Sequence, residues 1–228
     1  MSLVTPRKGY KSVPWLFGKE IEIPKEWENA LIINSGLKVL DGDRGNEYPK
    51  ENDFSDNGYC LFLSTKNVTR TGFSFVECQF ISKEKDQKLR KGCISIGDII
   101  ITTRGTVGNI AYFDHSVPYE KIRINSGMAI LQNQTKIISQ NYFYHLLKSP
   151  VIIRQLRRLQ YGSAIPQLTI GTINQIKLLI PSLPEQNKIA SILSNMDSKI
   201  TSQEQYKEKL QKLKKSLMQK LLTGEVRV

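Results

Sequence analysis

The sequence predicts an α+β fold in which a globular, sheet-rich domain is followed by one long α-helix. Residues 1–184 contain recurrent Gly and Pro and short apolar runs rich in β-branched residues, which are typical of strands separated by turns. Residues 185–222 contain neither Gly nor Pro and carry a helical stripe of apolar residues. We therefore expect two domains, residues 1–184 and residues 185–228.

The strands expected in the first domain are its short apolar runs, and turn residues separate them. The segment DGDRGN at residues 41–46 is one such turn, because Gly and Asx residues tolerate positive φ. This pattern predicts a twisted, mostly antiparallel sheet. The expected strands are residues 30–40, 59–63, 98–103, 110–113 and 128–132.

Residues 141–159 lack Gly, and their apolar positions suggest a helix or a pair of helices. Pro150 is expected at a helix start, because its missing N–H costs nothing in the first turn. The sequence therefore predicts a break at Ser149-Pro150.

Residues 185–222 are expected to form a single helix about 57 Å long, at ~1.5 Å per residue. Apolar residues recur at steps of three and four, which is typical of a coiled-coil seam, with a polar interruption at Gln203. We predict that this seam mediates homodimerisation; the alternative is a long helix packed on its own domain. Thr223-Gly224 is a suitable helix stop. The predicted interface residues are Leu193, Met196, Ile200, Tyr206, Leu210, Leu213, Leu217 and Leu221.

The composition points to a polyanionic partner. The 228 residues carry a formal net charge of +12, and most of the excess lies in residues 1–184. The alternative is a soluble protein that is merely basic. No apolar run approaches the ~18 residues of a membrane span, and the N-terminus has no signal-peptide core. Three cysteines without a CxxC motif predict neither a metal site nor a disulfide framework, so we expect a cytoplasmic protein without a membrane partner.

Catalytic constellations are missing from the sequence. It has no GxxxxGK[ST] phosphate loop, no GxGxxG after a strand and no NPPY-like or DPPY-like tetrapeptide. The two histidines, His115 and His145, are isolated from other catalytic residue types. The sequence therefore predicts a binding protein with no cofactor of its own.

Three passages resemble the specificity subunits of type I restriction–modification systems. Residues 96–108, IGDIIITTRGTVG, are similar to the family's "GD, strand, then R-x-T-x-G" signature. Residues 161–168, YGSAIPQL, resemble its "G-S-x-x-P-x-L" turn. Residues 180–190, IPSLPEQNKIA, and residues 217–224, LMQKLLTG, resemble the opening and the close of its conserved helix.

The resemblance implies a target recognition domain that reads one half of a bipartite double-stranded DNA target, followed by a helix that spaces and docks other subunits. Typical members carry two such domains and two antiparallel helices. This sequence has one of each, so it resembles a half-length form that needs two copies. The expected partners are modification subunits, which hold S-adenosylmethionine, and the restriction subunit. The chain itself is expected to be non-catalytic.

A DNA reader needs cationic side chains for phosphates and bidentate groups for base edges. Candidates cluster at the expected turns, and Arg104 and Tyr161 rank first because they lie inside the family-like motifs. Arg104 is predicted to read a base and Lys66 to contact a phosphate. The predicted DNA-binding residues are Arg44, Lys66, Asn67, Arg70, Arg104, Thr106, Asn109, Arg123, Arg157, Arg158, Tyr161, Ser163 and Gln167.

Three functions compete on the sequence alone. The first is a sequence-specific DNA-binding subunit. The second is a coiled-coil interaction protein whose basic domain binds nucleic acid weakly or without specificity. The third is an enzyme, such as a nuclease, whose motif is not recognisable.

Overall fold

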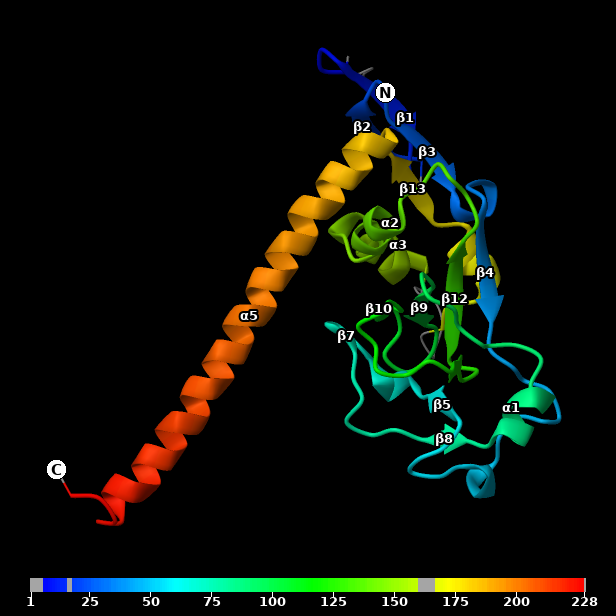
Figure 1. Cartoon of the computed structure of the whole chain (residues 1–228). Helices are drawn as coiled ribbons and strands as arrows, with labels where there is room; N and C mark the ends of the chain where they lie inside the picture. Colours follow the sequence, from blue (N-terminus) through cyan, green and yellow to red (C-terminus); the bar gives the residue numbers. More distant parts are fainter. Residues whose placement is uncertain (1–5, 16–17, 160–166, 228) are drawn as a thin grey trace. The chain divides into compact units, whose positions relative to one another are not determined.

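The computed structural model describes residues 6–15, 18–159 and 167–227 of the chain. They form two compact units, Met1–Gln186 and Asn187–Val228. The first contains the sheets and short helices, and the second contains most of one long helix (Figure 1). A sheet-rich domain followed by a long helix confirms the predicted fold class.

A four-stranded antiparallel sheet forms the centre of the first unit. Its order is β10 (Ile110–Tyr112), β9 (Ile99–Thr102), β12 (Met128–Asn133), β4 (Leu37–Asp41). Alternate residues of β9 point to opposite faces of the sheet, and all of them are buried. The segment IIIT therefore reads as a continuous apolar run because both faces of this strand are covered.

A second sheet, of three strands, packs against one face of the first. Its order is β11 (Ile122–Ile124), β5 (Cys60–Leu63), β8 (Phe80–Ile81), and β11 pairs with β5 in parallel. Leu61 and Leu63 join the core between the two sheets, together with Ile100 and Ile130. On the other face of β5, Cys60 and Phe62 pack with Ile81 and Leu89 in a smaller cluster. The predicted mostly antiparallel pairing is confirmed, but the strands are divided among several small sheets.

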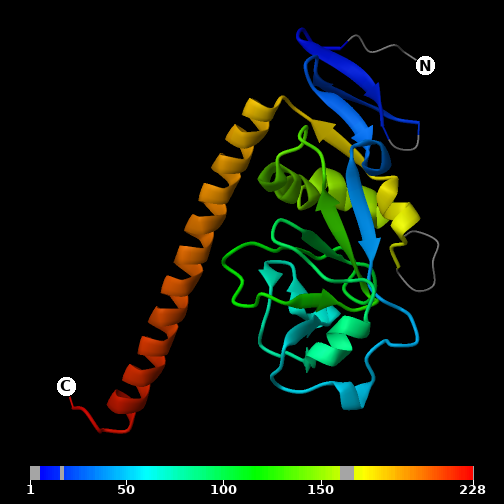
Figure 2. The ribbon, with the colours of Figure 1, turned by 45° about the vertical axis from the view of Figure 1, so that its right-hand side comes forward.

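Three two-stranded ribbons complete the β structure of the described residues. They are β1 (Tyr10–Pro14) with β2 (Glu20–Pro24), β3 (Glu28–Leu31) with β13 (Lys177–Ile180), and β6 (Val68–Thr69) with β7 (Gly72–Phe73). Figure 2 shows the β1–β2 ribbon at one end of this unit and the β5–β8 region at the other.

The single strand predicted at residues 30–40 is wrong. A 3₁₀ turn at Ile32–Asn34 separates β3 from β4, and the two strands belong to different sheets. The buried Ser35 hydroxyl donates to the Ile32 carbonyl (2.7 Å), and Gly36 adopts φ 79°. Asn34-Ser35-Gly36 interrupts the apolar run, and these three turn-forming residues mark the break in the sequence.

The predicted helix pair is confirmed. Helix α2 spans Gln140–Leu147 and α3 spans Pro150–Leu159, with Pro150 in the first turn of α3. Gln155, fully buried on α3, donates to the Lys177 carbonyl and accepts from the Lys177 N–H, both at 2.9 Å. These two hydrogen bonds pair the Gln155 side chain with the main chain of β13 and thereby fix α3 against that strand. Two further short helices are α1 (Lys83–Lys88) and α4 (Ile170–Asn174).

The predicted long helix is one continuous helix, α5, which spans Leu183–Leu222. Its first residues lie within the first unit, where the fully buried Gln186 accepts from the Ser139 N–H (2.7 Å) and donates to the carbonyls of Ile137 and Pro181. Gly224 adopts φ 74° just after the last turn, as the predicted stop requires. All eight predicted interface residues are between 41% and 58% exposed in the single chain.

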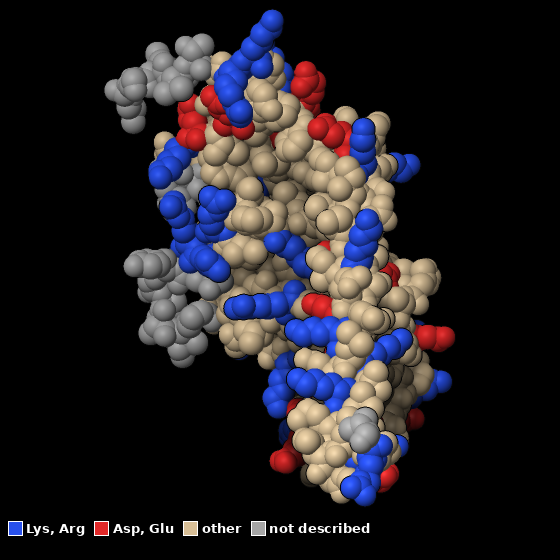
Figure 3. All heavy atoms as spheres, turned by 90° about the vertical axis from the view of Figure 1, so that its left-hand side faces the viewer, with Lys and Arg blue, Asp and Glu red and all other residues tan. Residues whose placement is uncertain are grey.

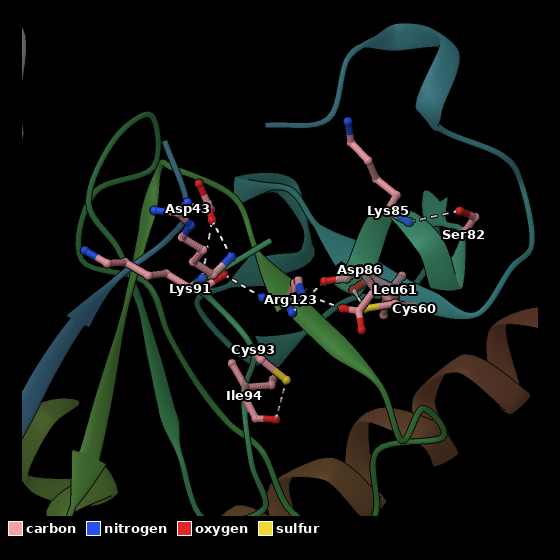
Figure 4. Close-up of polar contacts among 11 residues, drawn as sticks. Asp43, Cys60, Leu61, Ser82, Lys85, Asp86, Lys91, Cys93, Ile94 and Arg123 are labelled. Carbon is pink, nitrogen blue, oxygen red and sulfur yellow. Dashed lines mark hydrogen bonds and ion pairs between the residues drawn. The ribbon is translucent and has the colours of Figure 1, made fainter. Parts of the chain in front are cut away.

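Arg123 is a correction to the predicted DNA-binding set. It lies on β11, is only 7% exposed, and forms an ion pair with Asp86 of α1 (Figure 4). Its other guanidinium nitrogens donate to the carbonyls of Lys91 (2.7 Å) and Asp86 (2.9 Å). With all its nitrogens engaged inside the domain, Arg123 fastens α1 and the following loop to the small sheet.

We predict that Arg123→Ala lowers the free energy of unfolding by about 3–5 kcal/mol, because it leaves the Asp86 carboxylate partly buried without its partner. Urea denaturation of the full chain measures this effect. Arg7→Ala is the matched control, since Arg7 pairs with Glu22 on the surface, and we expect no resolvable change in its midpoint. Equal midpoints for the two variants would contradict the structural role of Arg123.

Candidate nucleic-acid interface

The loop between β9 and β10, residues 103–109, is held in one shape by hydrogen bonds at its base. The buried Thr102 side chain accepts from the Asn109 N–H (3.0 Å) and donates to the Thr106 carbonyl. Gly105 (φ 67°) and Gly108 (φ 89°) occupy left-handed positions that a residue with a Cβ rarely adopts. The spacing of the two glycines in R-G-T-V-G is therefore explained by the backbone. Their left-handed conformations let the loop fold back onto the Thr102 side chain.

This loop forms one wall of a groove of about 570 Å³. Its other lining residues come from the end of α2, from α3 and from the tip of the β6–β7 hairpin. Four predicted DNA-binding residues line the groove although they come from three separate segments: Arg70, Thr106, Asn109 and Arg157. Leu147, Ile153 and Leu156 provide an apolar surface between the polar groups.

A second group of predicted residues lies around the turn at residues 125–127. The Gly127 carbonyl accepts from the main-chain N–H groups of Thr103 (2.7 Å) and Arg104 (3.2 Å). Arg44 donates to the Ser126 carbonyl (3.1 Å) on the same turn. The Leu168 N–H donates to the Thr103 carbonyl (3.0 Å), which brings Gln167 beside Arg104. Two of the family-like motifs, far apart in sequence, thus meet at Thr103.

The structure corrects the prediction for Asn67. Its side chain is buried, with only 3% of the residue exposed, and accepts from the N–H and hydroxyl of Ser64 while donating to the carbonyls of Ser74 and Glu77. These four hydrogen bonds use both amide hydrogens and the carbonyl oxygen of Asn67, so no group remains for a DNA base. They also hold the chain on both sides of the β6–β7 hairpin.

The exposed cationic residues fall into two classes. Lys66 pairs with Glu77 (3.1 Å) and Arg44 with Asp41 (3.1 Å), so an anion must compete with a carboxylate at each. Arg70, Arg104 and Arg157 have no hydrogen bond or ion pair from their side chains within the described residues. Arg158 is also exposed on α3. Tyr161 and Ser163 lie outside the described residues.

Sequence reasoning missed Lys148, which directly follows α2 and lines the groove. Its ammonium donates to the Tyr144 hydroxyl (3.1 Å) and lies 4.8 Å from the centre of the Tyr144 ring. The four-residue spacing of Tyr144 and Lys148 is the signal that could have identified this pair. Together with Arg70 and Arg157, Lys148 gives the groove three cations.

Asp43 organises the turn that carries Arg44. It is buried, and it accepts from the N–H groups of Gly45 (2.7 Å), Arg90 (2.7 Å) and Lys91 (3.3 Å), as Figure 4 shows for the Asp43–Lys91 region. These main-chain donors, led by Gly45, lower the pKa of the Asp43 carboxyl below its ordinary value despite the opposing effect of burial. The chain near Arg44 and the loop after α1 are thereby tied to one carboxylate.

Within the described ranges, no group of three or more His, Cys, Asp or Glu side chains is placed to hold a metal ion. Burial raises the pKa of the Cys60 thiol to about 12, which keeps it protonated and unreactive.

Among the residues that the structure describes, no helix has the length and hydropathy to span a membrane. Figure 3 shows a face of the molecule on which Lys and Arg side chains predominate over Asp and Glu.

A basic groove on a domain of small sheets, followed by a long helix with an exposed apolar stripe, is the arrangement of a binding protein. The family model for the type I restriction modification DNA specificity domain matches residues 37–212. The chain therefore belongs to this family, and the resemblance drawn from its motifs is confirmed.

Relatives and solved structures agree with this assignment. The chain is 27% identical over 214 residues to the type I restriction enzyme MjaVIII specificity subunit of Methanocaldococcus jannaschii, covering 91% of this chain and 48% of the relative. It is 24% identical to the EcoKI specificity subunit of Escherichia coli, covering 90% of this chain and 43% of that subunit. The chain thus spans about half the length of the curated relatives it matches.

The fold is shared with the HsdS subunit from Thermoanaerobacter tengcongensis, with a TM-score of 0.59 at 17% identity over 86% of this chain and 48% of that one. A specificity subunit from M. genitalium gives a TM-score of 0.58 at 18% identity, over 86% of this chain and 46% of that one. Both likenesses show the fold of the domain and helix.

We predict that Asp43→Asn destabilises the chain by about 1–3 kcal/mol at neutral pH, because an amide N–H₂ would face the main-chain donors of Arg90 and Lys91. The lowered pKa means that the carboxylate stabilises the folded state fully above about pH 4, the ordinary range for Asp, and that this stability is lost as the pH falls through the lowered value. The difference in free energy of unfolding between the wild type and Asp43→Asn should therefore shrink in acid.

Urea midpoints measured at neutral pH and at successively lower pH provide this comparison. Asp56→Asn is the control, since Asp56 is exposed, and its midpoint should follow the wild type throughout. A gap between wild type and Asp43→Asn that widens in acid would contradict the role of the carboxylate.

Proposed function

We propose that this chain is the sequence-specific DNA-recognition subunit of a type I restriction–modification system, reading one half of a bipartite target in double-stranded DNA. The observation that carries the proposal is the groove in which Arg70, Thr106, Asn109 and Arg157 converge from three segments. Phosphate contacts need cations, and base edges need hydrogen-bonding groups held in fixed positions. The groove supplies both.

The proposal extends to assembly. With one recognition domain and one helix, two copies would provide two half-site readers, joined through the apolar stripe of α5. The helix would also dock modification subunits, which would supply the S-adenosylmethionine-dependent methyl transfer, and a restriction subunit. No cofactor is assigned to this chain. The complex would act in the cytoplasm, where its DNA substrate lies.

Membership of the specificity family favours this function over a coiled-coil protein with a weak nucleic-acid-binding domain. Three cations at one groove, none of which forms an ion pair with a carboxylate among the described residues, also favour a specific polyanion site. A nuclease is not favoured, because the family model describes DNA specificity rather than cleavage.

Selection from a random duplex library with the purified full chain tests the function. A symmetric dimer must read the same half-site on both strands, so the selected target should be an inverted repeat with a gap of fixed length. If each dimer makes ~6–10 phosphate contacts, affinity should fall ~10³–10⁵-fold between 50 and 200 mM salt. Selection of no motif, with affinity independent of salt, would instead support the coiled-coil alternative.

The stripe on α5 predicts a dimer of the free chain. Leu210→Glu with Leu213→Glu should give monomers, because each charge would be buried in the apolar seam. Light scattering at micromolar concentration measures the mass of both proteins. Lys209→Glu with Lys212→Glu is the matched control, since these residues lie off the stripe, and it should stay dimeric. A monomeric wild-type chain would contradict dimerisation through this helix.

A further inference from the structure

The β6–β7 hairpin contributes a tight two-residue turn to the groove. Thr69 pairs with Gly72, so only Arg70 and Thr71 form the turn. The Thr69 hydroxyl donates to the Gly72 carbonyl (2.9 Å) and accepts from the Thr71 N–H (3.3 Å). The tip of the hairpin is therefore closed by its own side chains, and the backbone that carries Arg70 has few alternative conformations.

The base of the hairpin is anchored on both strands. Val68 is 1% exposed and belongs to the main core, and the Phe73 ring packs against that core and stacks on Phe75 with centroids 5.5 Å apart. Asn67, immediately before the hairpin, is fixed by the four hydrogen bonds described above. These contacts hold the strands so that the tip cannot pivot freely.

Asn109 links the hairpin to the signature loop. Its side-chain amide donates to the Val68 carbonyl (2.9 Å), while its main-chain N–H is held by the Thr102 hydroxyl (3.0 Å). This predicted DNA-binding side chain therefore makes one hydrogen bond inside the domain. Its position ties the Arg70 hairpin to the loop at residues 103–109, which also lines the groove.

Arg70 itself is exposed, lines the groove and has no side-chain partner among the described residues. Arg157, also without one, lies in the last turn of α3 together with Arg158, and Arg154 lies about one turn earlier on the same helix. A helix face with several arginines suits contacts to the regularly spaced phosphates of the DNA backbone. A single guanidinium on a rigid turn suits one base edge, because bidentate recognition requires a fixed fork and little lost side-chain freedom.

We propose that Arg70 reads a guanine through its O6 and N7 in the major groove of the DNA half-site, and that Asn109 and Asn67 are positioning residues that hold it there. Arginine is the residue whose paired donors match these two acceptors. This assignment rests on the proposed function. It adds a base reader on the hairpin to the one predicted at Arg104, and it leaves the arginines of α3 to the phosphates.

The test is selection from a random duplex library, with Kd measured on single-base variants of the selected target. In Arg70→Ala, the preference for G·C over the other base pairs should fall roughly 5–150-fold at one position of the target. The base preferences at the other positions should be unchanged. Arg70→Lys keeps the charge but not the fork, so it should retain affinity and lose the same discrimination. Arg157→Ala should weaken binding to all sequences alike and reduce the salt slope by about 1.

Asn109→Ala tests positioning. It should relax the same base pair as Arg70→Ala, and the double variant should relax it no further, because the contact that Asn109 positions is already gone. Arg7→Ala, at the distant β1–β2 ribbon, should leave the motif unchanged. Additive losses at that base pair, or relaxation at a different one, would overturn the positioning role.

An unchanged motif, or uniform weakening, in Arg70→Ala would overturn the assignment of Arg70 while leaving the proposed function intact. A wild-type chain that selects no motif would overturn the proposed function and this assignment together. The two failures are therefore distinguished by the behaviour of the wild type alone.

Discussion

Hydrogen bonds from buried amide side chains to main-chain groups hold the loops of this domain in place. Its sheets have two to four strands, so much of the backbone lies outside ladders and needs other partners. Asn67 fixes the hairpin, Gln155 joins α3 to β13, and Gln186 joins the start of α5 to the chain before α2. An unpaired buried amide is costly, so each of these side chains defines one arrangement of the segments it connects.

The groove follows from these constraints. Its walls are a loop closed over Thr102, a hairpin held by Asn67 and Asn109, and a helix fixed through Gln155. None of these elements is stable alone, since a two-stranded ribbon or a ten-residue helix is marginal in water. The apolar core between the two sheets therefore stabilises the groove, and the amides set its shape.

The cationic side chains of this domain differ in how strongly each is paired inside it. Arg123 and Asp86 form a pair that stabilises the fold, whereas Lys66 pairs with the exposed Glu77 and Arg44 with the half-buried Asp41. Arg70, Arg104 and Arg157 remain without partners in the described part of the chain. A partner-free guanidinium loses no internal ion pair when it meets an anion, so these three are the most available for a polyanion. Net charge alone predicts the class of ligand but not which arginines bind it.

The sequence by itself determined the long helix, the helix break at Pro150 and the family, because these depend on local periodicity, proline geometry and contiguous motifs. It also identified Arg70, Thr106, Asn109 and Arg157 as candidates. Only the tertiary structure showed that these four meet at one groove, that the run at residues 30–40 divides between two sheets, and that Arg123 and Asn67 are buried. A charged or amide residue at a strand end looks the same in sequence whether it faces solvent or a partner. Burial and pairing depend on segments far away in the chain, such as Asp86 for Arg123, and only the packed fold brings them together.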